Sequence, residues 1–374
     1  MSKSKPYCLM PWIHFHVGDD GTAKACCVAN IPFGNINTDG FETIWNGKPI
    51  EQLRTKFKKG ELDKRCAQCY KLEETGGKSI RQETFEKFPE VDVFNNPPSL
   101  PIYFDIRFSN VCNLKCRTCW HGASSAWFDD AKKLGTNKGE KAVIKNISDF
   151  ENFIAELGPS LLQAKEIYLA GGEPLVTEEH YLLLQWLIDN NATQMKLRYN
   201  TNFTLLNFKN QSVLAYWKHF ETVEIMASID ALGDLGSYIR SGTSWSKIVN
   251  NHSKINESPN ITFQISPTIS VLNVLELPEL FSESISQNMI TENGMYINIL
   301  ERPFHYNIQI LPVSKKQIIT TKFELFMKSL TAKKAISQFQ EILDYMWAKE
   351  LSNHYPKFEI ENGKLDSIRG ETRQ

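Results

Sequence analysis

The chain has 374 residues, enough for two or three domains of ordinary size. Its 42 basic and 43 acidic residues cancel to a formal net charge of −1, which excludes the strongly basic balance expected when a nucleic-acid backbone is the main partner. Hydrophobic residues make up 41% and aromatic residues 11% of the chain, which excludes disorder over most of its length.

The N-terminus lacks a continuous apolar signal core, and no later run approaches the ~18 apolar residues of a membrane span. We therefore expect a cytoplasmic protein with no membrane partner. Eight cysteines in such a chain, several of them two or three residues apart, favour metal ligation or redox chemistry over disulfides. All eight lie in the first third of the chain, so the function is to be sought there.

Residues 1–95 are expected to form a small, loop-rich domain. They contain five cysteines, strand-like runs at 12–17 and 22–26 and a helix-like run at 49–58. A unit of this kind lacks a large core, and metal clusters can stabilise it. A proline-rich stretch that ends at Pro101 follows and resembles a linker.

Residues 96–312 show short β-branched or apolar runs that alternate with amphipathic ones, the pattern of repeated βα units and a parallel sheet. Amphipathic helices are predicted at 147–157 and 179–189. Six strands are too few for a closed eight-stranded barrel, so we predict an α/β fold with a partial (βα)6 barrel. Residues 313–374 form a C-terminal appendage, helical over 315–351 and then a polar tail. The predicted strands are 102–108, 166–170, 195–199, 222–229, 261–268 and 307–311.

Three cysteines follow the first of these strands closely. Cys112, Cys116 and Cys119 are separated by three and then two residues, so one tight loop can point three thiolates at one centre. A zinc site would need a fourth ligand, for which only His121 is near in sequence. Three thiolates on a four-iron cluster leave one iron open to a substrate or cofactor.

The C-x3-C-x2-C loop resembles that of the radical S-adenosylmethionine (SAM) enzymes, in which it follows the first strand of a partial barrel. The resemblance continues in Leu169-Ala-Gly-Gly-Glu-Pro-Leu175, in Asn200-Thr-Asn202, in Ser228-Ile-Asp230 and in the stretch around Arg240. It implies a four-iron four-sulfur cluster whose unique iron chelates SAM, with Glu173 accepting from the SAM ammonium group. The implied SAM-binding residues are Gly171, Gly172, Glu173, Asn200, Ser228, Asp230 and Arg240.

One position departs from the family pattern. Thr118 precedes the third cysteine, where the family most often has an aromatic residue near adenine. Trp120 and His121 are the candidates for that packing role.

The N-terminal cysteines have a spacing of their own. Cys8, Gly21 and Cys26 follow the order C-x(9–15)-G-x4-C, and Cys66 and Cys69 form a C-x2-C pair. This resembles the twitch domain, a shortened relative of the SPASM domain, which binds an auxiliary cluster. Neighbouring strand residues point to opposite faces, so Cys27 is expected outside the site. Structural zinc at the four cysteines is the alternative.

The resemblance implies an enzyme that cleaves SAM reductively to a 5′-deoxyadenosyl radical, which abstracts hydrogen from a substrate. The auxiliary cluster would assist a net oxidation or a crosslinking reaction. The implied partners are a small-molecule or peptide substrate and an electron donor such as flavodoxin or ferredoxin. The alternatives are an RNA- or nucleotide-modifying radical SAM enzyme and a non-catalytic iron–sulfur or zinc protein. The C-terminal appendage is expected to help cover the barrel mouth.

Overall fold

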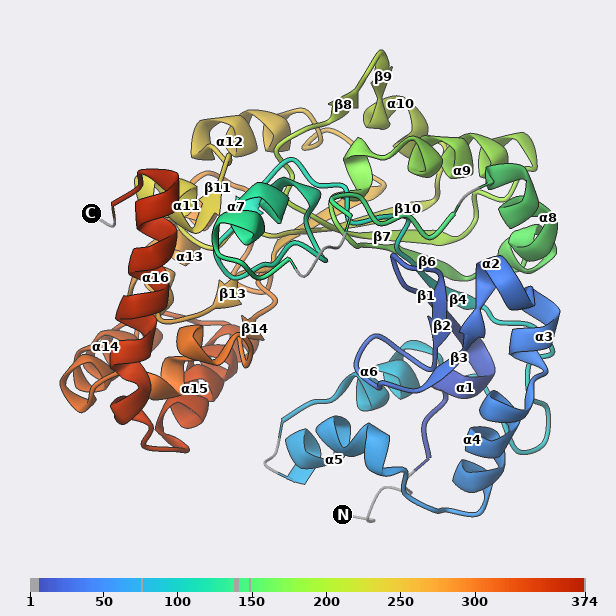
Figure 1. Cartoon of the computed structure of the whole chain (residues 1–374), viewed down its shortest axis with the longest axis horizontal. Helices are drawn as coiled ribbons and strands as arrows, with labels where there is room; N and C mark the ends of the chain where they lie inside the picture. The colour runs from blue at the N-terminus through green and yellow to red at the C-terminus, as the bar shows by residue number, and fades with distance from the viewer. Residues whose placement is uncertain (1–6, 75–76, 138–140, 148, 373–374) are drawn as a thin grey trace. The chain divides into compact units, whose positions relative to one another are not determined.

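The computed structural model describes residues 7–74, 77–137, 141–147 and 149–372 (Figure 1). Contacts within the chain divide it into two compact units. Unit 1 comprises Met1–Asn110, Val143–Arg198 and His219–Thr222, and unit 2 comprises Val111–Ala142, Tyr199–Lys218 and Val223–Gln374. Each unit is thus assembled from segments that are far apart in the sequence.

Unit 1 is built on a largely parallel sheet. Its strands are β1 (His14–Val17), β2 (Thr22–Lys24), β3 (Pro32–Asn35), β4 (Tyr103–Ile106) and β6 (Glu166–Leu169), with the first residues of β7 (Lys196–Thr201). The order is β7-β6-β4-β1-β2-β3. β1 and β6 both run parallel to β4, whereas β2 is antiparallel to its neighbours. The N-terminal strand β1 therefore shares a sheet with two strands predicted for the barrel.

The strands of this sheet alternate apolar and polar side chains. Phe15 and Phe104 face one side and are fully buried. His16 pairs in register with Asp105, and Asp105 pairs in register with Tyr168, on the opposite side. One face of the sheet thus packs against a hydrophobic core, and the other carries a row of polar and aromatic groups.

Helices complete unit 1, and several begin at the signals that the sequence contains. In α4 the buried residues Ile50, Leu53 and Phe57 recur at helical spacing, and in α8 the Asp149 side chain caps the first turn. The helices predicted at 49–58, 147–157 and 179–189 are confirmed as α4, α8 and α9; Ser148 lies outside the described residues. The helices are α1 (Met10–Ile13), α2 (Ile36–Asp39), α3 (Phe41–Trp45), α4 (Lys48–Lys58), α5 (Ala67–Glu74), α6 (Ile80–Lys87), α8 (Phe150–Leu161) and α9 (Glu178–Asp189).

Unit 2 contains the remaining strands and most of the C-terminal helices. The last residues of β7, β10 (Thr222–Ala227) and β12 (Ile261–Ile265) lie side by side, and β10 and β12 are parallel. Short pairs join β5 (Lys115–Cys116) to β11 (Arg240–Ser241), β8 (Asn207–Phe208) to β9 (Gln211–Ser212) and β13 (Thr268–Ile269) to β14 (Asn298–Ile299). The helices are α7 (Phe128–Lys133), α10 (Val213–Trp217), α11 (Gly233–Ile239), α12 (Trp245–Ser253), α13 (Leu277–Ser286), α14 (Val313–Met327), α15 (Lys333–Trp347) and α16 (Tyr355–Arg369).

The parallel α/β fold class is confirmed, and the prediction of a strand at 307–311 is wrong. Asn307 caps a short 3-10 helix, η6 (Ile308–Ile310), because its side chain accepts a hydrogen bond from the backbone of Gln309. The predicted polar tail is polar but also largely helical, since α16 occupies it (Figure 1). None of the helices in the described part of the chain has the length and apolar character needed to cross a lipid bilayer.

Candidate iron–sulfur and SAM site

The three-cysteine loop of unit 2 is anchored by a short strand pair. β5 contains Cys116 and is antiparallel to β11, with Cys116 opposite Arg240 in the register. The Nη1 atom of Arg240 lies 3.7 Å from the Cys116 sulfur. At the start of the loop, Asn202 Nδ2 donates to Asn113 Oδ1 at 2.8 Å and lies 4.0 Å from the Cys112 sulfur. Segments that follow β7 and α11 therefore support the loop from two sides.

Burial dominates the electrostatics of this loop. It raises the pKa of the Cys116 thiol, against the lowering effect of the Arg240 charge. It raises the pKa of Cys119 to about 12, and the neighbouring Cys116 adds to that shift. Buried thiolates of this kind need a cation or metal to hold their charge. Of the two candidates for adenine packing, Trp120 is 58% exposed and His121 is buried.

Three of the predicted SAM-binding residues line one small hollow in unit 2. They are Ser228, Asp230 and Arg240, with Trp245 among the surrounding residues. Asp230 accepts from Arg240 Nε at 2.8 Å and from Arg240 Nη2 at 3.0 Å, and it also accepts from the Thr268 backbone. This fork-to-fork pair leaves Nη1 of the guanidinium directed at Cys116.

The two asparagines at the end of β7 occupy different environments. Asn200, the predicted ligand, lies within the strand and is partly buried. Asn202, two residues later, is the one that reaches the cysteine loop. Its own Oδ1 accepts from the backbone of Thr204, so the amide is held in one orientation. The Asn-Thr-Asn pattern located the end of β7 correctly. Only the bounds of the strand, which ends at Thr201, show that Asn202 lies beyond it.

The Gly-Gly-Glu-Pro turn belongs to unit 1. Gly171 and Gly172 have φ angles of +81° and +48°, in the left-handed region that favours glycine. A Cβ on Gly171 would lie 2.6 Å from Cβ of Arg107, so this turn needs glycine for space as well. Glu173 is buried and accepts from the Leu175 backbone at 3.1 Å, capping the short helix η3 (Pro174–Val176).

The four predicted N-terminal cysteines all lie in unit 1. Burial raises the pKa of the Cys8 thiol, and the charges of Cys26, Cys66 and Cys69 raise it further. Burial likewise raises the pKa of Cys26 and of Cys66 to about 11 each. The charges of three of these cysteines thus act on Cys8, and four thiols are the donor set that an iron–sulfur cluster takes.

Cys27 differs from these four cysteines in its exposure. It is exposed, and Asp105 and Arg107 are among the charged groups near it. His16 Nδ1 lies 2.8 Å from Asp105 Oδ2, while Arg107 Nε lies 3.2 Å from Asp105 Oδ1. No role for Asp105 or Arg107 was predicted from the sequence. Side chains alternate between the two faces of β1 and β4, and this alternation could have shown that these groups share one face of the sheet. His14 and His16 are buried on this face.

Within the described ranges, no group of three or more His, Cys, Asp or Glu side chains has the geometry to hold a metal ion.

Comparisons with known proteins identify the N-terminal segment. Residues 8–70 match the SPASM family, described as an iron-sulfur cluster-binding domain. Among solved structures, the crystal structure of Streptococcus suis SuiB bound to S-adenosylmethionine matches with 17% identity and a TM-score of 0.39. The match covers 75% of this chain and 59% of the SuiB chain, so this chain spans less than two thirds of that protein. A search of curated proteins gives no match. Segment 8–70, which contains Cys8, Cys26, Cys66 and Cys69, is therefore similar to the iron–sulfur cluster-binding domains of the SPASM family.

Proposed function

We propose that the chain is a radical SAM enzyme, with the SAM-binding cluster on Cys112, Cys116 and Cys119. The observation that carries the proposal is the guanidinium of Arg240, which lies against the Cys116 sulfur and in the same hollow as Ser228. When bound, the cluster supplies the electron that cleaves SAM to methionine and a 5′-deoxyadenosyl radical, which takes hydrogen from a substrate.

The residues of the chain bind and orient SAM in this proposal. Arg240 offers a donor that stays charged at every physiological pH, which suits the SAM carboxylate, and the carboxylate of Asp230 orients it. Ser228 contributes a hydroxyl to the same hollow. In unit 1, the glycines at 171 and 172 allow close backbone approach, and Glu173 is proposed to accept from the SAM ammonium group.

We further propose that Cys8, Cys26, Cys66 and Cys69 hold an auxiliary four-iron cluster. The SPASM match supports this assignment, and so do the charges of Cys26, Cys66 and Cys69, which raise the pKa of the buried Cys8 thiol. Such a cluster serves electron transfer, which favours a net oxidation or a crosslink on a peptide or small-molecule substrate. A cytoplasmic donor such as flavodoxin or ferredoxin would supply the electron for SAM cleavage.

The proposal is tested by anaerobic incubation of the reconstituted protein with SAM and dithionite. We expect 5′-deoxyadenosine and methionine in equal amounts, measured by liquid chromatography and mass spectrometry. The triple variant C112A/C116A/C119A is expected to form neither product. Cys27→Ala is the matched control, since it removes a cysteine outside both proposed sites and should leave cleavage intact. Equal cleavage by the triple variant and the wild-type protein would show that the loop is not the site.

Metal analysis separates the proposal from its alternatives. Two four-iron clusters require about eight irons per chain. About four irons with one zinc would assign zinc to the N-terminal cysteines and leave the radical chemistry in place. A full complement of iron without 5′-deoxyadenosine would favour a non-catalytic iron–sulfur protein. RNA that stimulates SAM cleavage, where peptides and small molecules do not, would favour the RNA-modifying alternative.

A further inference from the structure

The most deeply held side chain of the cysteine loop is an arginine. Arg117 follows Cys116 directly, and its side chain is fully buried, with 0% exposure. Its Nη2 lies 2.6 Å from Asp366 Oδ1 and 2.5 Å from Glu371 Oε2. Its Nη1 donates to Asn362 Oδ1 at 3.1 Å. The guanidinium is therefore bound by three side chains from α16 and the residues just after it, about 250 positions further along the chain.

The same C-terminal residues hold the strand that pairs with the loop. Arg117 stacks over the ring of Tyr238 at 3.6 Å and donates from Nε to the Tyr238 carbonyl at 2.8 Å. The Tyr238 hydroxyl donates to Asp366 at 2.9 Å. Glu371 accepts from Ser241 of β11 at 2.9 Å while it also binds Arg117. One carboxylate thus bridges the loop and β11.

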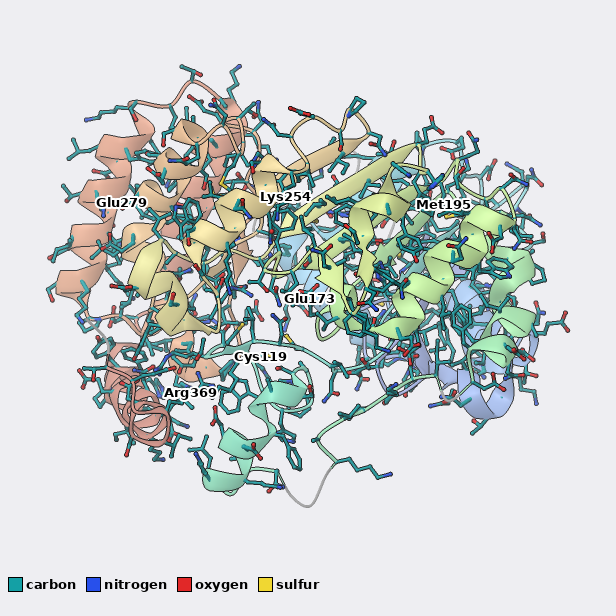
Figure 2. All side chains as sticks on the ribbon, turned by 90° about the horizontal axis from the view of Figure 1, so that it is seen from above. Cys119, Glu173, Met195, Lys254, Glu279 and Arg369 are labelled. Carbon is teal, nitrogen blue, oxygen red and sulfur yellow. The ribbon has the colours of Figure 1, made fainter. Side chains whose placement is uncertain are left out.

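A second anchor lies on the other side of the loop. Arg369 Nε donates to Asp130 at 2.8 Å, and its guanidinium lies 5.0 Å from the ring centre of Trp127. The Trp127 indole donates to the Cys116 carbonyl at 2.6 Å. Trp127 and Leu365 share a small hydrophobic cluster against which Cys119 packs. Figure 2 shows Cys119 and Arg369 near one another.

We propose that residues 362–371 form a C-terminal clamp that positions the cysteine loop for its cluster. The inference rests on the proposed function, and it adds a role for the polar end of the chain. Arg117 lies between Cys116 and Cys119 in the sequence. Fixing its side chain therefore restricts the backbone conformation of the loop and with it the orientation of the two cysteine side chains. Within the clamp, Asp366 and Glu371 are positioning residues, because their contacts run through Arg117, Tyr238 and Ser241 and not through a thiol.

The test removes the clamp's charges and follows the loop's thiols. The variant is D366N/E371Q in the full-length reconstituted protein, and the matched control is Glu359→Gln, an exposed carboxylate on the same helix. Each protein is exposed anaerobically to an iron chelator and iodoacetamide, and alkylation of each cysteine peptide is followed by mass spectrometry. Cys66 and Cys69 serve as the internal reference, since they belong to the other proposed site.

We expect Cys116 and Cys119 to be alkylated at least about tenfold faster in D366N/E371Q, because two charge-assisted contacts to a buried arginine are lost. Alkylation of Cys66 and Cys69 should be unchanged, as should all rates in Glu359→Gln. Equal rates in the variant and the wild-type protein would overturn the clamp. If the double variant fails to fold, Glu371→Gln alone and Arg117→Lys make the same comparison with smaller perturbations.

Alkylation of the wild-type protein, with and without chelator, tests the proposed function separately. If the loop holds a cluster, chelator must be present before Cys116 and Cys119 react. If they react at once without chelator, the loop carries no cluster and the proposed function fails. The clamp still predicts faster alkylation in D366N/E371Q in that case, so the two failures remain distinct.

Discussion

Replacing Asp230 by asparagine tests whether the hollow beside the cysteine loop depends on a buried ion pair. The Asp230 side chain is 0% exposed and that of Arg240 is 12% exposed. Burial by itself lowers the pKa of Arg240. The charge and hydrogen bond of Asp230, together with the charges of Cys116 and Cys119, outweigh that effect and raise the pKa overall. Asp230→Asn removes that charge with almost no change in volume, and it turns one oxygen that accepts from Arg240 into a donor.

The size of the effect follows from what the substitution leaves behind. Removing one partner of a buried ion pair costs about 3–5 kcal/mol, because the other charge stays buried without compensation. Asparagine retains one oxygen, which can still accept from the Thr268 backbone. We therefore expect the free energy of unfolding to fall by about 3 kcal/mol. Arg240→Gln should cost a similar amount, and the double variant should cost clearly less than the sum of the two.

The assay is urea unfolding of the four proteins at pH 7, under reducing anaerobic conditions, followed by circular dichroism. Asp234→Asn is the control, because it changes an exposed carboxylate on the adjacent helix α11 and should shift stability by less than about 0.5 kcal/mol. A loss below about 1 kcal/mol for Asp230→Asn, or strictly additive effects in the double-mutant cycle, would refute the reasoning.

Three further predictions concern SAM binding, pH and backbone strain. Arg240→Ala should weaken SAM binding to the reconstituted protein at least about tenfold by equilibrium dialysis, since a charged donor to the carboxylate is lost; unchanged binding would remove Arg240 from the site. Burial lowers the pKa of His180 to about 3, so the unfolded chain binds a proton first as the pH falls, and the free energy of unfolding should drop by about 2 kcal/mol from pH 7 to 5. Burial also lowers the pKa of His14, which adds its own loss, so His180→Gln should reduce the total drop by about 2 kcal/mol in urea titrations, whereas His219→Gln, at an exposed histidine, should leave the total drop unchanged. Gly171→Ala should cost about 1–3 kcal/mol in the same titrations, because φ is +81° and Arg107 fills the space; wild-type stability would contradict the strain argument.

The sequence alone was sufficient for features that depend on neighbouring residues. Helix α4 follows from apolar side chains repeated at three and four residues, because an α-helix has 3.6 residues per turn. The turn at Gly171 follows from a glycine pair between a strand and a proline, where other residues would be strained. The spacing of Cys8, Cys26, Cys66 and Cys69 was also enough to predict a resemblance to a twitch or SPASM domain, and the SPASM family model matches residues 8–70.

Local patterns were misleading where packing decided the structure. Residues 307–311 alternate polar and apolar side chains like a strand, but the Asn307 cap and the burial of Ile308 and Ile310 together produce a 3-10 turn. The sequence of a short apolar run does not indicate which surface of the protein the run will pack against. For the same reason the sequence indicated a polar tail where the structure has α16, whose face toward unit 2 is decided by contacts with α7 and η5 (Phe304–Tyr306).

Only the tertiary structure could join groups that are far apart in the chain. Arg117 lies next to the best-recognised cysteine motif in the sequence, yet nothing near it in sequence indicates Asp366 or Glu371 as its partners. Likewise, the charge of Cys66 acts on Cys26 only after the chain has folded. Sequence periodicity reports on which residues share a helix or strand face, whereas the pairing of distant charges and thiols depends on how those elements pack, which is a property of the whole chain.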